Sequence, residues 1–464
     1  MIRLLALCGY VYQSFTAIIL IFVLSHVLEP SHYTAFSLTI AVSQFLTVVA
    51  YEWLQLAGQR FLSSSRGDEA AQLQSSLFTA LALSTLALAV VGGIALSLGW
   101  TSRLLIALGL AITIMQGTTD LHFMMIRVSG RLAASSLLLI SRATLLLLGA
   151  ATGAWFYGTT TAALLGILAG HSLSLVLGSL VDGAILHWSP RRSRRADLAA
   201  FARYGVLASG ASIVHLSAPI LIRFLVIGRY GISSSDSAGF SMALDLLQRP
   251  FSVLLSAIHT ISYPDVVRRY DNGTRQEAQK AGAELFDLAI CSTAIMLGGL
   301  ITFIPDTARL FVPPALIPSF LAVTPGVATF YFLHTHLQAT LAMVPHLQKA
   351  ALRLIVLAAC QLLLISIFIL ISSAVDTSPI SALVSAAVAT GIMIVLASGP
   401  TIRFGARPRI GLAVSAIVGG TLIGSLVALP SVPLVWLAGK IVVAAAVTLF
   451  VAWYGDFLHH DQET

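Results

Sequence analysis

The sequence predicts an all-α integral membrane protein of about 14 transmembrane helices, built as two six-helix lobes in a parallel pseudo-twofold repeat with two further C-terminal helices. Three observations predict this class. Hydrophobic residues make up 57% of the 464 residues and charged residues only 10%, against roughly 25% in a soluble domain. Apolar runs of membrane-spanning length recur along the chain, and Lys and Arg gather in alternate loops.

The apolar runs give the positions of the helices. A bilayer core about 30 Å thick needs about 20 apolar residues per helix. The first run is too long for a cleaved signal peptide, whose apolar core has about 7 to 15 residues. With this window, the candidate spans begin near Leu4, Thr34, Leu77, Leu104, Ala133, Ala162, Gly205, Phe240, Leu285, Ile317, Leu352, Ile380, Ile410 and Leu434.

The Lys and Arg residues predict the orientation of these spans, because cytoplasmic loops carry an excess of both. With the N-terminus inside, every basic residue falls in a cytoplasmic segment, Arg66 among them, apart from two small groups. Four fall outside, namely Arg103, Arg229, Arg309 and Lys440. Three fall within spans, namely Arg142, Arg223 and Arg249. We therefore expect a multi-pass protein of the bacterial cytoplasmic (inner) membrane with both termini in the cytoplasm.

The composition also excludes several function classes. The net charge is +7, but the basic residues lie in short loops, so we expect no nucleic-acid partner. Cys8, Cys291 and Cys360 lie in or beside apolar runs without C-x-x-C spacing, and we expect buried small hydrophobes and no metal site. No Walker A, H-E-x-x-H, G-x-S-x-G or Gly-rich nucleotide motif occurs, which predicts no cofactor and no enzymatic activity.

An internal echo predicts the two lobes. The stretches "AFSLTIAVSQF" and "GFSMALDLLQR" share a Phe-Ser pair and a later Gln at an offset of 204 residues, and each begins the second helix of its half. Six helices, a basic linker and six helices in the same orientation describe a parallel repeat around a central cleft. We expect a first lobe at 1–190, a basic cytoplasmic linker at 191–204, a second lobe at 205–400, and the last two helices with the cytoplasmic C-terminus at 401–464.

Both stretches, with their flanks, resemble a known family. "VLEPSHYTAFSLTIAVSQF" and "SAGFSMALDLLQRP" are similar to the loop and second helix of each lobe in the Wzx-type polysaccharide transporters of the MOP flippase superfamily. The exit "ISYPDVVRRY" fits the pattern, whereas "LAGQRFLSSS" lacks its Pro. The resemblance implies a MATE-like fold that moves an undecaprenyl-pyrophosphate-linked oligosaccharide to the outer leaflet by alternating access. It also implies a role in O-antigen or exopolysaccharide biosynthesis, with polysaccharide assembly proteins as partners.

Charged residues inside the spans are the first candidates for a binding site. A charge at the centre of a membrane helix costs at least about 2.5 kcal/mol on insertion scales, so it must face a polar partner or a wet cavity. Asp245 and Arg249 are four residues apart on one helical face, with Gln248 beside them. They form either an ion pair that satisfies itself or part of the cleft lining.

Two further arginines lie inside predicted spans. Arg142 is close to the middle of the fifth span, where its side chain cannot reach the interface, and we expect it to face the cleft. Arg223 is near the outer end of the seventh span and either snorkels to the interface or binds substrate. A guanidinium suits pyrophosphate because its planar fork donates two parallel hydrogen bonds.

Polar residues on the second span form one stripe, which consists of Ser37, Gln44, Glu52, Gln55 and Gln59. In a membrane such a stripe lines a hydrophilic passage, where amides bond sugar hydroxyls, or it hydrogen-bonds to a neighbouring helix. Asp120 and Asp287 lie near the interface and receive no role.

Histidines inside the predicted spans are further candidates for a role in transport. The histidines His171, His215, His259, His334 and His336 are packing residues or carry a coupling proton, with H+ or Na+ as the coupling ion.

A MATE-type multidrug or cation antiporter is the main alternative, but three intramembrane arginines favour an anionic substrate. A lipid II flippase and a membrane glycan polymerase are less favoured alternatives.

Overall fold

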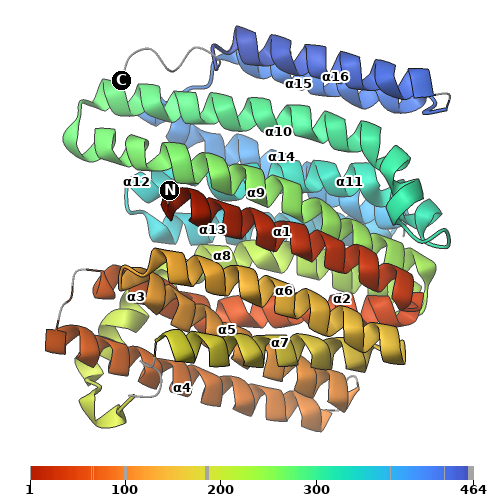
Figure 1. The fold of residues 1–464 in the computed structure, drawn as a ribbon. Helices are drawn as coiled ribbons and strands as arrows, with labels where there is room; N and C mark the ends of the chain where they lie inside the picture. Colours follow the sequence, from red (N-terminus) through yellow and green to blue (C-terminus); the bar gives the residue numbers. More distant parts are fainter. Residues whose placement is uncertain are drawn as a thin grey trace. The chain divides into compact units, whose positions relative to one another are not determined.

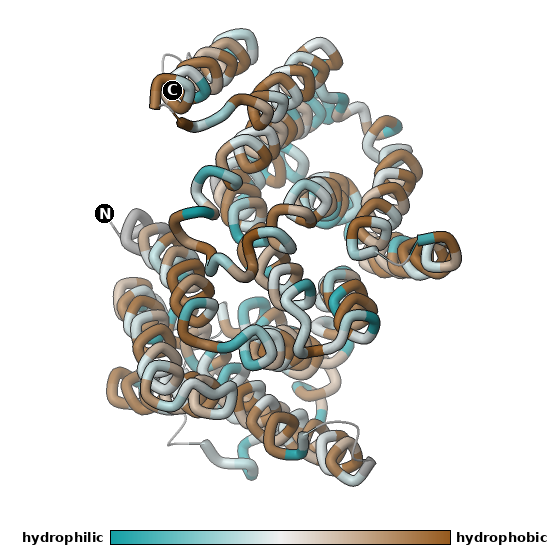
Figure 2. Tube along the Cα trace, turned by 90° about the vertical axis from the view of Figure 1, so that its right-hand side faces the viewer, coloured by the Kyte–Doolittle hydropathy of each residue, from teal (hydrophilic) through white to brown (hydrophobic). Residues whose placement is uncertain are grey.

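The computed structural model describes residues 2–63, 65, 67–98, 102–182, 188–376, 378–432 and 434–457, and their side chains except those of 2–7, 260 and 261. Arg66 and the C-terminal residues 458–464 of the sequence prediction lie outside this part of the chain. Within it, 13 helices are long and apolar enough to cross a membrane, and hydrophobic residues predominate along them (Figure 2). The predicted eighth span is also one helix, of 38 residues, but it carries more charge. The predicted all-helical membrane fold is confirmed.

The helices follow one another in a nearly continuous series (Figure 1). The first half contains α1 (Ile2–Val27), α2 (Pro30–Thr47), η1 (Val48–Glu52), α3 (Trp53–Leu62), α4 (Gly67–Leu98), α5 (Arg103–Val128), α6 (Leu132–Tyr157), α7 (Thr160–Val181), η3 (Pro190–Arg192) and α8 (Arg195–Tyr230). The second contains α9 (Ser235–Asn272), α10 (Arg275–Phe311), α11 (Ile317–Thr335), η4 (His336–Thr340), α12 (Met343–Leu347), α13 (Ala351–Ser373), α14 (Pro379–Phe404), α15 (Ile410–Ser425), η5 (Leu426–Ala428) and α16 (Leu434–Tyr454).

The chain forms two compact units, Met1–Ser241 and Met242–Thr464. In the first unit, α6 packs against α1 and α7, α5 packs against α7, and α8 packs against α3. In the second unit, α10 packs against α15, and α14 packs against α11 and α13. The first unit includes α8, which the sequence analysis assigned to the second lobe, so the lobe boundaries stay predictions.

Small residues allow the closest helix contacts. A methyl group on Gly149 of α6 would stand 2.4 Å from the carbonyl oxygen of Gly166 on α7, and one on Gly153 would stand 2.3 Å from that of Ala162. Membrane helices use such small residues because backbones can then approach closely. Cys8 and Cys360 are exposed and only Cys291 is buried, which corrects the expectation for the first two. Exposure of a thiol to lipid is not unfavourable, because lipid is as apolar as a protein core.

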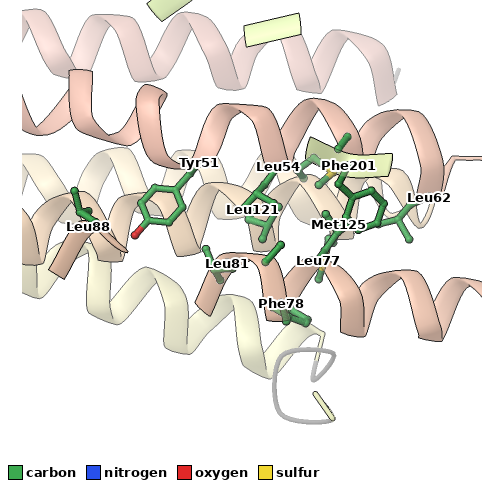
Figure 3. Close-up of a cluster of buried hydrophobic side chains, with 13 residues drawn as sticks. Tyr51, Leu54, Leu62, Leu77, Phe78, Leu81, Leu88, Leu121, Met125 and Phe201 are labelled. Carbon is green, nitrogen blue, oxygen red and sulfur yellow. The ribbon is translucent and has the colours of Figure 1, made fainter. Parts of the chain in front are cut away.

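A cluster of large apolar side chains fixes the first unit around η1. The ring of Tyr51 lies among leucines of α4 and α5 (Figure 3), and its hydroxyl is 3.0 Å from Oγ1 of Thr85 on α4. Gly117 of α5 faces this ring so closely that a methyl group there would stand 2.1 Å from it. The packing of Tyr51 therefore sets the position of the next residue, Glu52.

Candidate functional site

The polar stripe of the second span crosses a π-helical turn. Eight residues separate Gln44 from Glu52, whereas two α-helical turns take about 7 residues. The turn η1, Val48–Glu52, accommodates the additional residue because a π turn is wider than an α turn. Ser37 and Glu52 therefore lie on nearly the same face of the span, and both contact α8.

Arg223 of α8 binds the N-terminal part of this stripe. Its Nη1 donates to the carbonyl oxygen of Ser37 at 3.0 Å and to the Ser37 hydroxyl at 2.6 Å. Arg223 is only 4% exposed, so its guanidinium is buried against α2 rather than snorkelling to the interface. This contact joins one of the candidate arginines to the Phe-Ser motif of the internal echo.

Glu52 makes a second contact with α8, farther along the same stripe. It is partly exposed, and its carboxylate accepts a hydrogen bond from the Ser212 hydroxyl of α8. The two helices meet closely here, because a methyl group on Gly205 would stand 2.2 Å from the carbonyl oxygen of Trp53. The stripe thus makes hydrogen bonds between helices, at Ser37 and Glu52, which was the second of the two interpretations of this pattern.

The three glutamines of the stripe have a different environment, and Gln59 is exposed at its C-terminal end. Gln44 is also exposed and Gln55 is partly exposed, so all three side chains have accessible area on the first unit. A role for them in binding sugar hydroxyls stays a prediction.

Arg142 lies in a separate site between α5, α6 and α7. Its Nη1 forms a short ion pair with Oδ1 of Asp120 on α5, and its guanidinium carbon is 5.3 Å from the centre of the Phe123 ring. His171 of α7 interacts electrostatically with both charges. Arg142 is 7% exposed. Sequence reasoning found this arginine but gave its partner Asp120 no role.

The charged face of α9 keeps the arrangement that the sequence predicts. Arg249 interacts electrostatically with Asp245 one turn earlier and with Tyr331 of α11. Asp245, Gln248 and Arg249 are all partly exposed. These three polar groups lie well inside a 38-residue helix, far from either end, so this face carries charge at a depth where lipid would be unfavourable.

Sequence reasoning missed two ion pairs that attach the C-terminal helices to α10. Asp287 accepts hydrogen bonds from the backbone N of Arg409 at 2.8 Å and from its Nε at 2.7 Å. At the other end, Lys440 of α16 lies 3.2 Å from Asp306, which also accepts from the Ser431 hydroxyl. Between these pairs, a methyl group on Gly298 would stand 2.1 Å from the carbonyl oxygen of Gly420. The hairpin of α15 and α16 lies along α10 (Figure 1).

Lys440 requires a correction. The sequence analysis placed it outside the membrane, but it lies in the second turn of α16 and is 1% exposed. The signal for its partner was present in the sequence as a stripe of acidic and small residues at spacings of three and four along one helix: Asp287, Cys291, Ala294, Gly298, Thr302 and Asp306.

Two buried histidines form hydrogen-bonded networks in the second unit. Nδ1 of His334 is 3.0 Å from Nε2 of Gln361, which also donates to Oγ1 of Thr390 at 3.1 Å. This network joins α11, α13 and α14 and supports a packing role for His334. His336 contacts Thr293 of α10 and Thr340 of its own π turn.

Comparison with known proteins gives the fold a name. No family model matches the chain, and no curated protein sequence does. A solved structure titled lipid II flippase MurJ, in an inward closed conformation, matches with a TM-score of 0.72 at 12% identity and covers 98% of this chain and 100% of its own.

Two multidrug transporters are also similar. An inward-facing MATE family transporter of the MOP superfamily matches with a TM-score of 0.66 at 14% identity, over 84% of this chain and 94% of its own. The MATE transporter DinF-BH matches with a TM-score of 0.61 at 15% identity, over 85% and 93%. At these identities the likeness shows the fold alone, which this chain shares with the flippase and the two transporters.

Proposed function

We propose that this protein is a flippase that moves a lipid-linked oligosaccharide, with an undecaprenyl-pyrophosphate carrier, from the cytoplasmic to the outer leaflet for surface polysaccharide biosynthesis. The observation that carries the proposal is the charged face of α9. Arg249 is partly exposed there beside Asp245 and Gln248. The likeness to the lipid II flippase, which extends over 98% of this chain, supports a lipid-linked substrate.

The chemistry of this face suits a substrate with an anionic head and a neutral glycan. The guanidinium of Arg249 donates two parallel hydrogen bonds to a pyrophosphate and stays charged when it is partly desolvated. The amide of Gln248 hydrogen-bonds sugar hydroxyls, a role that we also propose for the amides of Gln44 and Gln55 in the first unit. Asp245 neutralises Arg249 when no substrate is bound, so the arginine is never an unpaired charge in the membrane.

The proposal also includes polar groups of the first unit. Arg142 and Arg223 are each engaged by a protein partner, and in this proposal their guanidinium groups bind the anionic head group. Glu52 stays tied to α8 through Ser212. Alternating access then exposes the site first to one leaflet and then to the other, and a gradient of H+ or Na+ drives the cycle.

Deletion of the gene tests the proposal. We expect lipid-linked oligosaccharide to accumulate and surface polysaccharide to disappear, as measured by mass spectrometry of lipid extracts and by surface labelling. The wild-type gene restores export, whereas Arg249→Gln restores it poorly because the pyrophosphate loses a charged donor worth about 1.5 to 3 kcal/mol, or roughly tenfold or more. Arg229→Gln, at the exposed end of α8, is the matched control and restores export fully. Normal lipid intermediates in the deletion strain would contradict the proposal.

A multidrug or cation antiporter is the second candidate. The partly exposed carboxylates of Glu52 and Asp245 favour it, and it would share the fold of the MATE transporters. Ethidium efflux from cells that express the protein distinguishes the two functions. A flippase leaves ethidium accumulation unchanged, and an antiporter lowers it in a way that Asp245→Asn abolishes.

A further inference from the structure

The linker between α7 and α8 carries a dense cluster of positive charge. Four of its side chains in the short stretch 191–195 are exposed arginines, to which we refer as the linker arginines: Arg191, Arg192, Arg194 and Arg195. Within the described part of the chain, none of the four belongs to an ion pair. Their charge is therefore open to a partner outside the protein.

Hydrogen bonds fix the linker along the first part of α4. The indole Nε1 of Trp188 donates to Oγ1 of Thr79 at 3.2 Å. The backbone N of Arg194 donates to the Ser76 hydroxyl at 3.3 Å, and this hydroxyl donates to Asp197 in the first turn of α8 at 2.9 Å. The short helix η3 also packs against α4. The linker arginines are thus held on a defined surface of the first unit.

These contacts place the linker at the depth of the lipid head groups. The apolar run of α4 is predicted to begin near Leu77, and Thr79 and Ser76 lie on either side of that point. Farther out, Gln72 donates to Asp197 at 2.9 Å. At about 1.5 Å per residue, the linker meets α4 from about 3 Å inside to about 8 Å outside the start of the apolar run. A head-group layer is about 5 to 8 Å thick, so the linker arginines lie where lipid phosphates lie.

Trp188 has the position of an interfacial anchor. Its side chain is 39% exposed, and its indole N–H is bonded to Thr79. Tryptophan is enriched at membrane–water interfaces because its ring system is apolar and its N–H is polar. Along α4, Trp188 contacts the membrane end of the linker's path and the arginines follow toward water. This is the order expected of a segment that lies in the interface.

Acidic side chains near the linker leave the cluster positively charged. Asp197 has hydrogen bonds with uncharged groups of α4. Asp68 and Glu69 are exposed in the first turn of α4, about 12 Å or more before its apolar run, which is on the water side of the head-group layer. Arg195 begins α8, where the positive end of the helix dipole disfavours a cation. An external anion would relieve this accumulation of positive charge.

A membrane surface is a better match for this cluster than a single bound anion. The linker arginines are exposed along the linker instead of being gathered around one enclosed point, which suits a layer of phosphates. Guanidinium groups donate well to phosphate, and each basic residue near an anionic membrane surface strengthens the attraction about fivefold.

We propose that the linker arginines and Trp188 form a binding surface for anionic phospholipids, which holds the start of α8 and the start of α4 at the membrane interface. The surface does not depend on what the protein transports. It therefore stands or falls separately from the proposed flippase function.

The test places a fluorescent reporter within the cluster. Cys8→Ala and Cys360→Ala remove the two exposed thiols, and Ser193→Cys, at a partly exposed position between the arginines, takes a bimane label. The protein is reconstituted into bilayers of phosphatidylcholine and phosphatidylglycerol, and one lipid at a time carries a nitroxide quencher near its head group. At low salt we expect labelled phosphatidylglycerol to quench at least about fivefold more effectively than labelled phosphatidylcholine. High salt reduces the difference, because it screens surface charge.

Variants of the linker arginines supply the controls. The quadruple variant Arg191→Gln, Arg192→Gln, Arg194→Gln, Arg195→Gln is expected to be quenched equally by both lipids. Its melting temperature stays that of the parent protein, because no ion pair is lost. Lys at the same four positions keeps most of the preference, since the charge is kept. Arg268→Gln with Arg269→Gln, two arginines that pair with Asp265, is the matched control and leaves the preference unchanged.

Several outcomes would overturn the proposal. Quenching by neither lipid means that the linker lies away from the bilayer. Equal quenching in the parent protein, or a preference that persists in the quadruple Gln variant, means that the linker arginines do not select anionic lipid. If the lipid-linked oligosaccharide, added at one molecule per protein, removes the quenching by phosphatidylglycerol, the cluster binds that pyrophosphate rather than a lipid surface.

Discussion

Three buried charges in the described part of the chain form ion pairs. Arg142 pairs with Asp120, Lys440 with Asp306, and the buried carboxylate of Asp287 with Arg409. The sequence was sufficient to find Arg142, because an arginine in mid-span is rare. It could not identify Asp120 as its partner, because periodicity shows which face a residue occupies but not which helix that face meets.

The pair of Arg142 and Asp120 gives a prediction about stability. Asp120→Asn leaves a guanidinium that is 7% exposed without a counter-charge. Breaking a buried ion pair from one side typically costs about 3 to 5 kcal/mol. We expect a large fall in melting temperature of the purified protein in detergent, and a low yield.

The double variant Arg142→Met, Asp120→Leu is the control, since replacing both charges by apolar groups is often neutral. We expect it to recover the melting temperature. Its export then separates two roles of Arg142. Normal export means that the pair is structural, and lost export in a stable double variant means that Arg142 acts on the substrate.

At the scale of elements, the sequence predicted the spans well and their distortions poorly. Apolar length sets where each helix lies, and all fourteen predicted spans coincide with helices. The π turns η1 and η4 were not predicted. For η1, the eight-residue spacing between Gln44 and Glu52 fits a loose α-helical stripe almost as well. The contact between α2 and α8, through Arg223 and Ser37, was not predicted either, because periodicity does not show which helix a polar face meets.

The crossing of α10 and α15 gives a prediction with an adjacent control. A methyl group on Gly298 would stand 2.1 Å from the Gly420 carbonyl oxygen, whereas one on Gly299 meets nothing within 4 Å. Overpacking of this kind costs about 1 to 3 kcal/mol. We expect Gly298→Ala to lower the melting temperature and Gly299→Ala to leave it unchanged or raise it. Equal effects of the two variants would mean that the crossing is looser than described.

For the whole molecule, the hairpin of α15 and α16 is part of the second unit rather than an appendage. Removing residues 409–464 leaves Asp287 and Asp306 of α10 without Arg409 and Lys440. We expect little monodisperse protein after detergent extraction, because two carboxylates become unpaired in an apolar setting. Adding Asp287→Asn and Asp306→Asn to the shortened chain is expected to recover part of the yield. A shortened chain that is as stable as the full one would show that the ion pairs contribute nothing.

The proposed function depends on the partly exposed face of α9, which the sequence singled out as a candidate site. Its residues are unusual for a membrane helix in type and in position, so composition alone singled them out. Recognition of a particular glycan, as proposed, would depend on shape and hydrogen-bond geometry across many residues, which no short motif in the sequence encodes.

The most direct test of the proposed transport uses purified protein in sealed vesicles, with the lipid-linked oligosaccharide that accumulates in the deletion strain as substrate. Periodate added outside oxidises only the glycan in the outer leaflet. We predict that the wild-type protein makes nearly all of the glycan accessible and that Arg249→Gln does so much more slowly, while Arg229→Gln matches the wild type. If the accessible fraction stays at the outer-leaflet share with the wild-type protein present, this chain does not flip the lipid.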